Sequence, residues 1–451
     1  MTLRYDPQTK NPSMRPTQKP FTVIDLFAGA GGLAEGFRQA GFEVVGGNDS
    51  DPDACATFAM NFPSTEVVHG DVRAPSIKRR ILELSRGVDV IVGGPPCQAF
   101  SQMRNHVRVI DDPRNSLYRE FVHIVGEVLP SAFLMENVTG IDQMGLREQI
   151  AMDLSLGGEY IVTPQVIDAA DVGVPQTRKR LIFLGVRRSQ CLAAPVVRQT
   201  SATRFVGLSR SERRGQVKYE LQASTDLFAG AACATLLDPE NTSMVTSEQA
   251  LSDLVFLKAG RREDEVKYDC LAPAQSAYQR YAREGAGDFL HNVQVPRIRS
   301  DTEQRLRAIP VGGNHRDLPE HLLARNLGDE RWGPENGTGL LSRRHYYAYR
   351  RLHPDMWSWT LNTKGDCVYH YGSRRSLSVR EFARLHSFPD KFVFTTDQRK
   401  GPLPGRHDGG AAHSRYRQVG NAVPPLLAKA CATAIASSMN SMVSEESLVA
   451  A

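Results

Sequence analysis

The chain has 451 residues, enough for roughly three domains of about 150 residues each and for a sizeable buried core. Hydrophobic residues make up 41% and charged residues 23%, a mixture that excludes a wholly disordered or fibrous protein. The longest apolar runs, such as Val88 to Val92, are far shorter than the roughly 18 residues of a membrane span. The net charge of +5 is only a weak indication of an acidic partner.

The cysteines indicate the compartment. They are seven in number and scattered, and none has the CxxC spacing of a zinc or redox motif. The first thirty residues contain no apolar core of a signal peptide. We therefore expect a reduced intracellular protein that has no zinc site built on cysteine.

Residues 1–20 contain four prolines and no hydrophobic periodicity, so we expect a flexible N-terminal tail. Over residues 21–190, short apolar runs alternate with helical patterns, which is typical of an α/β fold with a doubly wound, mostly parallel sheet. The predicted strands are Val23–Phe27, Phe42–Val45, Val67–His69, Val88–Val92, Ala132–Met135, Tyr160–Ile167 and Arg180–Val186. The predicted helices are Leu33–Ala40, Pro52–Asn61, Ser76–Ser85 and Asn115–Leu129.

The alternation stops after Arg187. Residues 191–372 are irregular and rich in Arg, Gly and Pro, and they predict a second, smaller, loop-rich domain. Residues 373–451 complete the chain with a helical pattern at Ser378–His386 and an apolar tail at Val423–Ile435.

The positive charge is concentrated in one stretch. Leu341 to Arg384 contains nine Lys/Arg against three acids, an excess of +6 in 44 residues, together with seven Tyr and Trp. Cations and flat rings suit a phosphate backbone with accessible bases. The alternative is a solvated face whose aromatic residues belong to the core.

The first predicted strand ends in a glycine-rich turn. Gly29-x-Gly31-x-x-Ala34 satisfies the dinucleotide fingerprint, in which glycines let the backbone approach a ligand in front of a helix N-terminus. Asp49 closes the second strand 20 residues after Gly29, where it could accept hydrogen bonds from ribose hydroxyls. The pattern predicts a nucleoside cofactor, and on these residues alone NAD is as good a candidate as any. Asp71, after the third strand, could take an adenine amino group or be an ordinary turn residue.

A thiol and an acid follow the next two strands. Cys97 lies in Gly93-Gly-Pro-Pro-Cys97, where glycines and prolines favour a rigid, exposed loop at the carboxyl end of a strand. Rigid presentation suits a nucleophile, although a thiolate also needs nearby positive charge or helix amides. Glu136 ends the fifth strand and so comes to the same edge of the sheet.

A polar run opens the last predicted strand. In Gln176-Thr-Arg178-Lys-Arg180, alternation places Gln176, Arg178 and Arg180 on one face. Three aligned polar side chains near a thiol and an acid predict an anionic or nucleotide substrate.

With these motifs in this order, the chain resembles the DNA (cytosine-5)-methyltransferase family, of the bacterial restriction-modification type. The resemblance covers most of Phe21–Val186 and Arg374–Pro425. It rests on seven ordered segments: DLFAGAGGL, GDV, GGPPCQAFS, ENV, QTRKR, VREFARLHSFPD and RYRQVGNAVPP.

The resemblance implies S-adenosylmethionine as the cofactor, S-adenosylhomocysteine as its product, and no metal. Phe27 would lie against the adenine, Asp49 would hold the ribose, and Asp71 with Val72 would meet the adenine edge. Many members have an aromatic residue after the ribose acid, where this chain has Ser50. The cofactor residues implied are Asp25, Phe27, Gly29, Gly31, Gly32, Asp49, Ser50, Asp71, Val72, Pro96, Leu117 and Asn421.

The resemblance also implies the chemistry. The Cys97 thiolate would add to C6 of a flipped-out cytosine, and Glu136 would protonate or hydrogen-bond N3. Arg178 and Arg180 would hold the base or its phosphate, with Gln176 supporting the catalytic loop. The segment that contains Arg104, His106 and Arg108 would close over the substrate.

The 193 residues between Arg180 and Arg374 would contain the target recognition domain, and residues 373–451 would return to the catalytic domain. The Leu341–Arg384 stretch would then face DNA. We expect a monomer acting on double-stranded DNA in the bacterial cytoplasm, near the nucleoid and away from membranes. A tRNA methyltransferase of the same family would have a more compact recognition region, and a catalytically silent DNA-binding module would not need Cys97 and Glu136.

Overall fold

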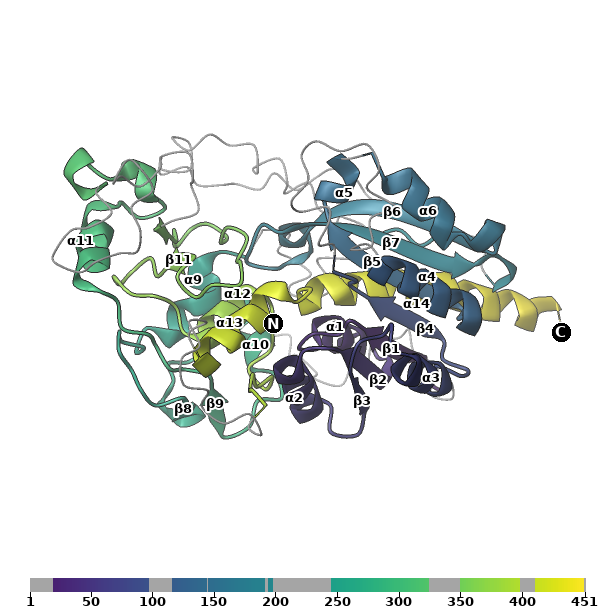
Figure 1. Ribbon diagram of the computed structural model, residues 1–451. Helices are drawn as coiled ribbons and strands as arrows, with labels where there is room; N and C mark the ends of the chain where they lie inside the picture. The colour runs from purple at the N-terminus through teal and green to yellow at the C-terminus, as the bar shows by residue number, and fades with distance from the viewer. Residues whose placement is uncertain are drawn as a thin grey trace, which may run out of the picture.

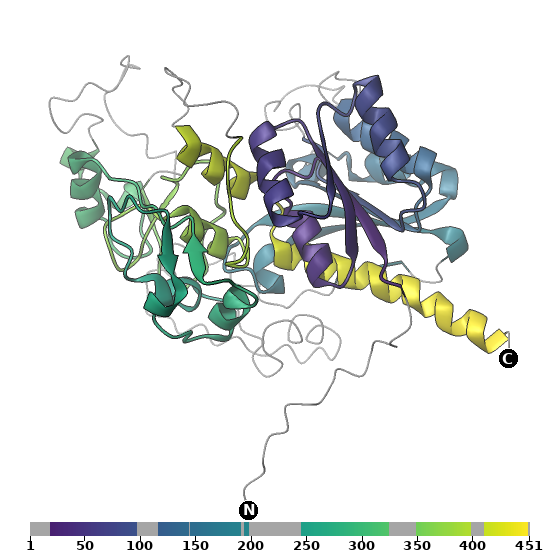
Figure 2. The same cartoon turned by 90° about the horizontal axis from the view of Figure 1, so that it is seen from below.

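The protein is described by a computed structural model over residues 19–96, 116–143, 145–190, 194–197, 245–323, 349–397 and 410–449. It has two lobes, which lie side by side in Figure 1 and Figure 2. The sheet lobe is built from the N-terminal part of the chain and the last helix. The small lobe is built from the segments between residue 245 and about residue 397.

The sheet has seven strands in the order β3-β2-β1-β4-β5-β7-β6. The first five pair in parallel, and β7 is antiparallel to both β5 and β6. The doubly wound, mostly parallel sheet that the sequence predicts is therefore confirmed. The strands are β1 Thr22–Leu26, β2 Glu43–Asp49, β3 Glu66–His69, β4 Val90–Gly93, β5 Ala132–Val138, β6 Tyr160–Asp168 and β7 Lys179–Arg187.

Side chains alternate between two buried faces of the sheet. Val23 packs into one apolar cluster and Ile24 into the other, as do Val92 and Ile91 of β4. Because successive side chains of a strand point to opposite faces, a sheet covered on both sides needs this continuous apolar pattern.

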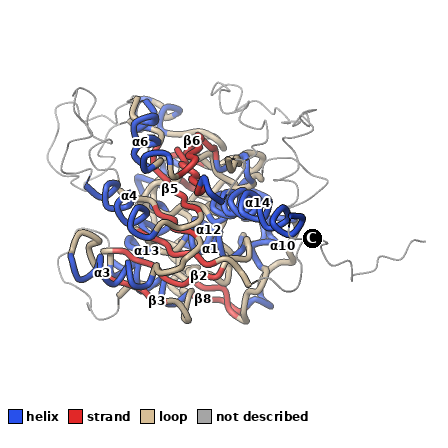
Figure 3. The backbone as a smooth tube through the Cα atoms, turned by 90° about the vertical axis from the view of Figure 1, so that its right-hand side faces the viewer, coloured by secondary structure: helices blue, strands red, loops and turns tan. Residues whose placement is uncertain are grey.

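Helices cover both faces of the sheet. The helices α3, α4 and α6 lie on one face, and α1 and α14 on the other, so that in Figure 3 the strands lie between them. The helices of this lobe are α1 Gly32–Gln39, α2 Pro52–Asn61, α3 Pro75–Leu84, α4 Ser116–Val128, α5 Gly140–Gln143, α6 Arg147–Leu154 and α14 Pro425–Val449. Short 3-10 turns are η2 Leu156–Gly158, η3 Ala169–Val172 and η4 Arg188–Gln190.

The small lobe has short elements joined by long connections. Two two-stranded sheets, β8 with β9 and β10 with β11, stand among its helices. Its strands are β8 Glu265–Lys267, β9 Phe289–His291, β10 Arg350–Arg351 and β11 Val368–Tyr369. Its helices are α9 Ser247–Leu251, α10 Ala277–Arg283, α11 Ser300–Ala308 and α12 Val379–Leu385, with 3-10 turns η6 Ser252–Leu254, η7 Tyr268–Cys270, η8 His315–Asp317 and η9 Glu320–Leu322.

Buried ion pairs hold α12 inside the small lobe. Arg384 is fully buried and donates to Asp253 at 2.7 Å and to Asp390 at 2.6 and 2.8 Å. Arg375 makes two bonds of 2.7 and 2.8 Å to the buried Glu381. The expectation that the Leu341–Arg384 stretch faces DNA is therefore wrong for these cations, because their charges are neutralised inside the lobe. In the described part of that stretch, Lys364 and Arg374 are the exposed cations.

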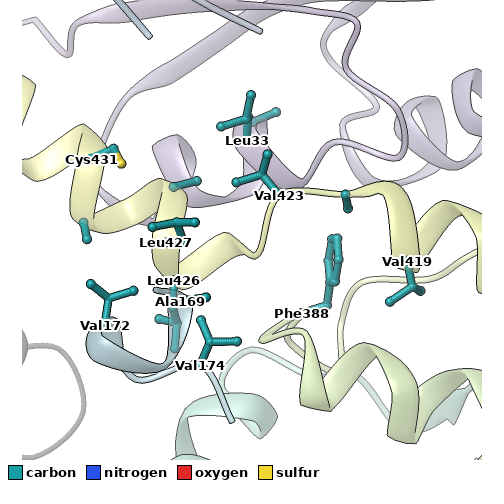
Figure 4. Packing of buried hydrophobic residues seen from close by; sticks show 14 of the residues in the cluster. Leu33, Ala169, Val172, Val174, Phe388, Val419, Val423, Leu426, Leu427 and Cys431 are labelled. Carbon is teal, nitrogen blue, oxygen red and sulfur yellow. The ribbon is translucent and has the colours of Figure 1, made fainter. Parts of the chain in front are cut away.

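Helix α13, Gly410–Asn421, leads from the small lobe back to the sheet, and α14 then runs along the sheet lobe to the C-terminus (Figure 1). Val423 faces Leu33 of α1, and Leu426 and Leu427 pack near Ala169 (Figure 4). By length and composition, the helical stretch His413–Met439 could cross a membrane, but 72% of its apolar window is buried inside the fold. Burial of this kind is what a core helix shows.

Candidate active site

A pocket of about 750 Å³ lies at the carboxyl ends of β1 to β5 and beside the start of β7. Ligands in open α/β sheets bind at this edge. The pocket is lined by twelve of the residues that the sequence predicts for the site: Phe27, Gly29, Asp49, Ser50, Asp71, Val72, Pro96, Leu117, Glu136, Arg178, Arg180 and Asn421.

The turn after β1 forms one wall of the pocket. Phe27 has φ +55°, a left-handed conformation that costs a residue with a Cβ about 1–2 kcal/mol. Gly29 has φ +54°, and a Cβ placed on it would meet nothing within 4 Å, so its backbone faces open space. An exposed backbone in a strained turn leaves room for a ligand to approach closely.

Asp49 ends β2 beneath that turn. Its two carboxylate oxygens accept hydrogen bonds from the backbone N–H groups of Gly29 and Asp51, both at 2.8 Å. Burial raises the pKa of Asp49, and these N–H groups oppose the rise. Since each oxygen has a further lone pair, the carboxylate can still accept from a ligand hydroxyl in the pocket.

Asp71 lies at the mouth of the pocket with a partner that the sequence did not predict. Arg73 donates to it through Nε at 3.0 and 3.1 Å and through Nη2 at 2.5 Å. These hydrogen bonds hold the pKa of Asp71 below its usual range. Asp71 therefore presents to the pocket a carboxylate that is already bound on one side.

Three predicted cofactor residues lie behind the pocket rather than in its lining. Asp25 is fully buried and accepts from the Ala34 N–H at 3.0 Å, at the start of α1. A Cβ on Gly31 would lie 2.8 Å from the Phe62 ring, and one on Gly32 would lie 2.2 Å from the Val423 carbonyl oxygen. These two glycines permit close packing, a role different from the predicted contact with the cofactor.

The loop that leads toward Cys97 is held against β5. Asn137 donates from Nδ2 to the Pro95 carbonyl at 3.1 Å, and a Cβ on Gly94 would lie 3.0 Å from Glu136 Oε2. The loop therefore passes close over Glu136, and a side chain on Gly94 would push the Glu136 carboxylate aside. Cys97 itself, like Arg104, His106 and Arg108, lies outside the described residues.

Glu136 and Arg180 form an ion pair inside the pocket. Arg180 Nε lies 2.6 Å from Glu136 Oε1, and the two side chains are 13% and 14% exposed. Strands β5 and β7 are neighbours, and Val138 of β5 lies opposite Arg180 of β7. Glu136 is two residues before Val138 and on the same face of the sheet, so its side chain comes next to that of Arg180. The pair places a partly shielded carboxyl group at the edge of the pocket.

Gln176 and Arg178 differ from their predicted roles. Strand β7 begins at Lys179, and Gln176 lies before it in an isolated bridge with Ser358 of the small lobe. The Arg178 guanidinium is buried and donates to the carbonyls of Leu361, Gly420 and Ala422. Burial and the nearby Arg180 lower its pKa.

The hydrogen bonds of Gln176 go to three other positions in the lobe junction. It donates to the Leu385 carbonyl at 3.1 Å and meets His386 at 2.9 Å, and it accepts from the Leu361 N–H at 3.0 Å. Arg178 and Gln176 therefore join the two lobes, and among the described residues it is Asn137 that holds the loop before Cys97.

Sequence reasoning missed the wall that the small lobe supplies. Residues 360–363 line the pocket, because Ser358 pairs with Gln176 and Thr360 Oγ1 donates to the Thr177 carbonyl at 2.7 Å. No periodicity marks that segment. Arg417 of α13 also lines the pocket and bonds Asp51 at 2.8 Å. Its place directly before Gln418-x-Gly420-Asn421, within the segment RYRQVGNAVPP, was the available signal.

A metal site is not evident in the described ranges, which contain no group of three or more His, Cys, Asp or Glu side chains that could hold an ion. The acids of the pocket are instead bound by arginines and backbone N–H groups.

Comparisons with known proteins agree with this geometry. A sequence model of the family C-5 cytosine-specific DNA methylase matches residues 21–437. The chain belongs to this family. It is a DNA (cytosine-5-)-methyltransferase.

Among its relatives, the Type II methyltransferase M1.HphI of Haemophilus parahaemolyticus is 30% identical over 419 residues, which cover 92% of this chain and 86% of that protein. The Type II methyltransferase M.AgeI of Thalassovita gelatinovora is 31% identical over 460 residues, covering 92% and 98%. A solved structure named for a prophage-encoded DNA modification methyltransferase (E. coli) shares the fold with TM-score 0.62 at 24% identity, covering 93% of this chain and 99% of that one.

Family membership decides between the alternatives that the glycine turn left open. The fold and the family support the use of S-adenosylmethionine, so the NAD alternative is dropped. The substrate of a C-5 cytosine-specific DNA methylase is DNA.

Proposed function

We propose that this methyltransferase modifies cytosine C5 within a short, specific duplex sequence, through a covalent bond between Cys97 and C6. The observation that carries the proposal is the Glu136–Arg180 pair, 2.6 Å long, which lies in the same pocket as Phe27, Asp49 and Asn421. The residues proposed for the cofactor and the acid proposed for the cytosine thus line one cavity of about 750 Å³.

The pocket fits S-adenosylmethionine. Asp49 offers lone pairs to the ribose, the Phe27 ring offers a flat apolar surface to the adenine, and Gly29 leaves its backbone open. Ser50, Asp71, Val72, Pro96, Leu117 and Asn421 complete the lining. Bound there, the cofactor supplies an electrophilic methyl group next to the cytosine.

The residues of the chain make cytosine C5 reactive. The Cys97 thiolate forms a bond to C6, and the displaced ring electrons make C5 nucleophilic while Glu136 delivers a hydrogen bond or a proton to N3. Arg180 holds Glu136 and faces the base. After C5 has taken the methyl group, loss of the C5 proton re-forms the ring double bond and expels the thiolate.

The cytosine must leave the helix before Cys97 can reach it. A ring stacked in duplex DNA hides its C6 face, and flipping it out costs a few kcal/mol. We infer that the small lobe binds the duplex as the target recognition domain. Its described part runs from residue 245 to about residue 397, so the boundary predicted at residue 372 lies within this lobe, and α13 and α14 complete the catalytic domain of residues 21–190.

The biological setting we propose is a restriction-modification system in the bacterial cytoplasm, with a monomeric enzyme working on nucleoid DNA. Support comes from the relatives, which are named as Type II methyltransferases.

The first experiment replaces the proposed nucleophile. Cys97→Ala is expected to abolish methyl transfer to DNA, while S-adenosylhomocysteine still binds, since the thiol does not hold the cofactor. The exposed Cys270 gives the matched control, because it lies on the surface of the small lobe. Turnover by Cys97→Ala equal to that of Cys270→Ala would exclude Cys97 as the nucleophile.

A second experiment traps the covalent intermediate. DNA with 5-fluorocytosine at the target should form a stable adduct with the enzyme, because fluorine cannot leave as a proton does. Bisulfite sequencing of a plasmid from cells that express the chain identifies the target. Failure to trap an adduct on that target would contradict the covalent mechanism.

A further inference from the structure

His386 lies at the point where the two lobes meet. It is the C-cap residue of α12 and is fully buried. Helix α12 is fixed to the small lobe by Arg384 and its acids, so the imidazole projects from a firmly held element. Its two nitrogens contact two other parts of the chain.

The contacts assign the tautomer of the ring. Nδ1 lies 2.9 Å from Gln176 Nε2, which is an amide donor, so Nδ1 accepts. Nε2 lies 2.8 Å from the Ala422 carbonyl oxygen and therefore donates. Burial and the nearby Arg178 cation lower the pKa of His386, so the ring is neutral, as one donor and one acceptor require.

The same carbonyl belongs to a larger network. Arg178 Nη2 also donates to Ala422, at 3.2 Å, and to Gly420 at 2.8 Å. Arg178 Nη1 donates to the Leu361 carbonyl at 3.1 Å. Both carbonyl segments line the pocket, so this network determines where that wall stands.

The next residue in the chain, Ser387, makes a second contact with the connection between α13 and α14. Ser387 has φ +61°, and its Oγ accepts from the Leu426 N–H at 3.1 Å. His386 and Ser387 together therefore hold the Ala422–Leu426 segment at both ends, between α13 and α14.

We propose that His386 is a positioning residue of the methyltransferase: it fixes the Gly420–Ala422 wall, which includes Asn421, relative to Gln176 and the start of β7. The inference rests on the proposed function, since the wall matters only if Asn421 faces the cofactor and Arg180 the cytosine. A misplacement of about 1 Å at such a wall can cost on the order of 10²-fold in rate.

Apolar packing alone would not set this position. The His386 ring stacks on Phe388 with a centroid distance of 6.1 Å, and apolar residues surround the junction (Figure 4). A leucine could keep much of that packing but would leave the Gln176 amide without its imidazole partner. The wall could then shift while the lobes remain folded.

The test compares two buried histidines. His386→Leu removes both ring bonds, whereas His370→Leu is the matched control: His370 is 3% exposed, lies in the small lobe and binds the N–H groups of Gly372 and Ser373, away from the pocket. The conservative variant His386→Gln keeps one acceptor for Gln176 and one donor for Ala422.

We expect His386→Leu to raise the Kd for S-adenosylhomocysteine and the KM for S-adenosylmethionine by about tenfold relative to His370→Leu, with His386→Gln within about threefold of wild type. Thermal unfolding of each variant shows that the comparison is made on folded protein. If His386→Leu does not fold, Gln176→Met takes its place; it removes the bond to His386 together with the bonds of Gln176 to Leu385 and Leu361.

Equal Kd values for the His386→Leu and His370→Leu proteins would overturn the inference, and so would a His386→Gln protein as weak as His386→Leu. If Gln176→Met is used instead, a Kd equal to that of the wild-type protein would likewise overturn the inference. Wild-type protein that does not bind S-adenosylhomocysteine would instead refute the proposed function, so the two failures are distinguishable.

Discussion

The two lobes use the same charged residue types in opposite ways. In the sheet lobe, Glu136 and Arg180 pair at the end of neighbouring strands and stay partly accessible in a pocket. In the small lobe, Arg384 pairs with Asp253 and Asp390 and none of the three is exposed. An ion pair at the carboxyl edge of a sheet can meet a substrate, whereas a sealed one can only hold the fold.

The largest expected effect is on stability, from breaking the buried ion pairs of Arg384. Arg384→Met leaves Asp253 and Asp390 buried with a missing cation, and breaking a buried pair in this way costs about 3–5 kcal/mol. We expect a corresponding loss in the free energy of unfolding, measured by urea denaturation. Arg374→Met, at an exposed arginine ten residues earlier, should change it by less than about 0.5 kcal/mol. Similar stabilities of the two variants would mean that the buried ion pairs do not hold the small lobe.

Breaking the Glu136–Arg180 pair in the pocket should lower activity. Glu136→Gln removes the acid that serves N3 of the cytosine, and we expect kcat to fall by about 10²–10⁴-fold. Unfolding stability should fall less than in Arg384→Met, because Glu136 faces the pocket whereas Arg384 is sealed inside the small lobe. Kinetic assays on target DNA and urea denaturation measure the two quantities.

Strand β7 offers the matched control for that variant. At its far end Arg187 Nε lies 2.6 Å from Glu159 Oε1, the same length as the pair in the pocket. Glu159→Gln should leave kcat unchanged. A loss of kcat in both variants would show that an ion pair on β7 acts on the reaction through the sheet.

A pH effect of intermediate size is expected from the small lobe. Burial lowers the pKa of His370 to about 4, although Glu381 acts in the opposite direction. An unfolded histidine has a pKa near 6.5, so below that pH the unfolded chain binds more protons and stability falls until about pH 4. The loss reaches at most about 3 kcal/mol. His370→Gln should reduce the slope of stability against pH between 6.5 and 4, and an unchanged slope would contradict this assignment.

The sequence predicted most of the sheet lobe, because its information is local. Alternation in Val23 and Ile24 marks a strand buried on both faces, and a carboxylate at the carboxyl end of a parallel strand comes to the pocket edge, as Asp49 and Glu136 do. Glycines were harder to assign. Gly29 and Gly32 look alike in the motif, but Gly32 is needed because of Val423, almost four hundred residues later.

The small lobe could not be predicted in the same way. Arg380 and Arg384 add to a positive run in the sequence, and nothing local shows that Asp253 and Asp390 neutralise them. The wall at residues 360–363 depends on Ser358 pairing with Gln176 across the lobes. Charge counts and spacing do not contain such long-range pairings.

The smallest effect is expected from Asp25, one of the buried acids of the sheet lobe, which lies in β1 next to α1. Burial raises its pKa, against the hydrogen bond from Ala34. Since the folded pKa is above the unfolded value, its contribution to stability is greatest below about pH 3.9 and is lost as pH rises through the folded pKa. Asp25→Asn keeps an acceptor for Ala34 and cannot ionise, so its stability relative to wild type should rise as the pH increases above about 3.9 and level off above the raised folded pKa.

Asp49→Asn provides the contrast on the neighbouring strand, because that carboxylate lines the pocket and Asp25 does not. We expect Asp49→Asn to weaken S-adenosylhomocysteine binding and Asp25→Asn to leave it within about twofold of wild type, since only the former changes a group that faces the ligand. A contradictory result would be that Asp25→Asn weakens binding as much as Asp49→Asn and shows no pH-dependent gain in stability. Asp25 would then take part in the chemistry of the pocket and could not be counted among the sealed charges that only hold the fold.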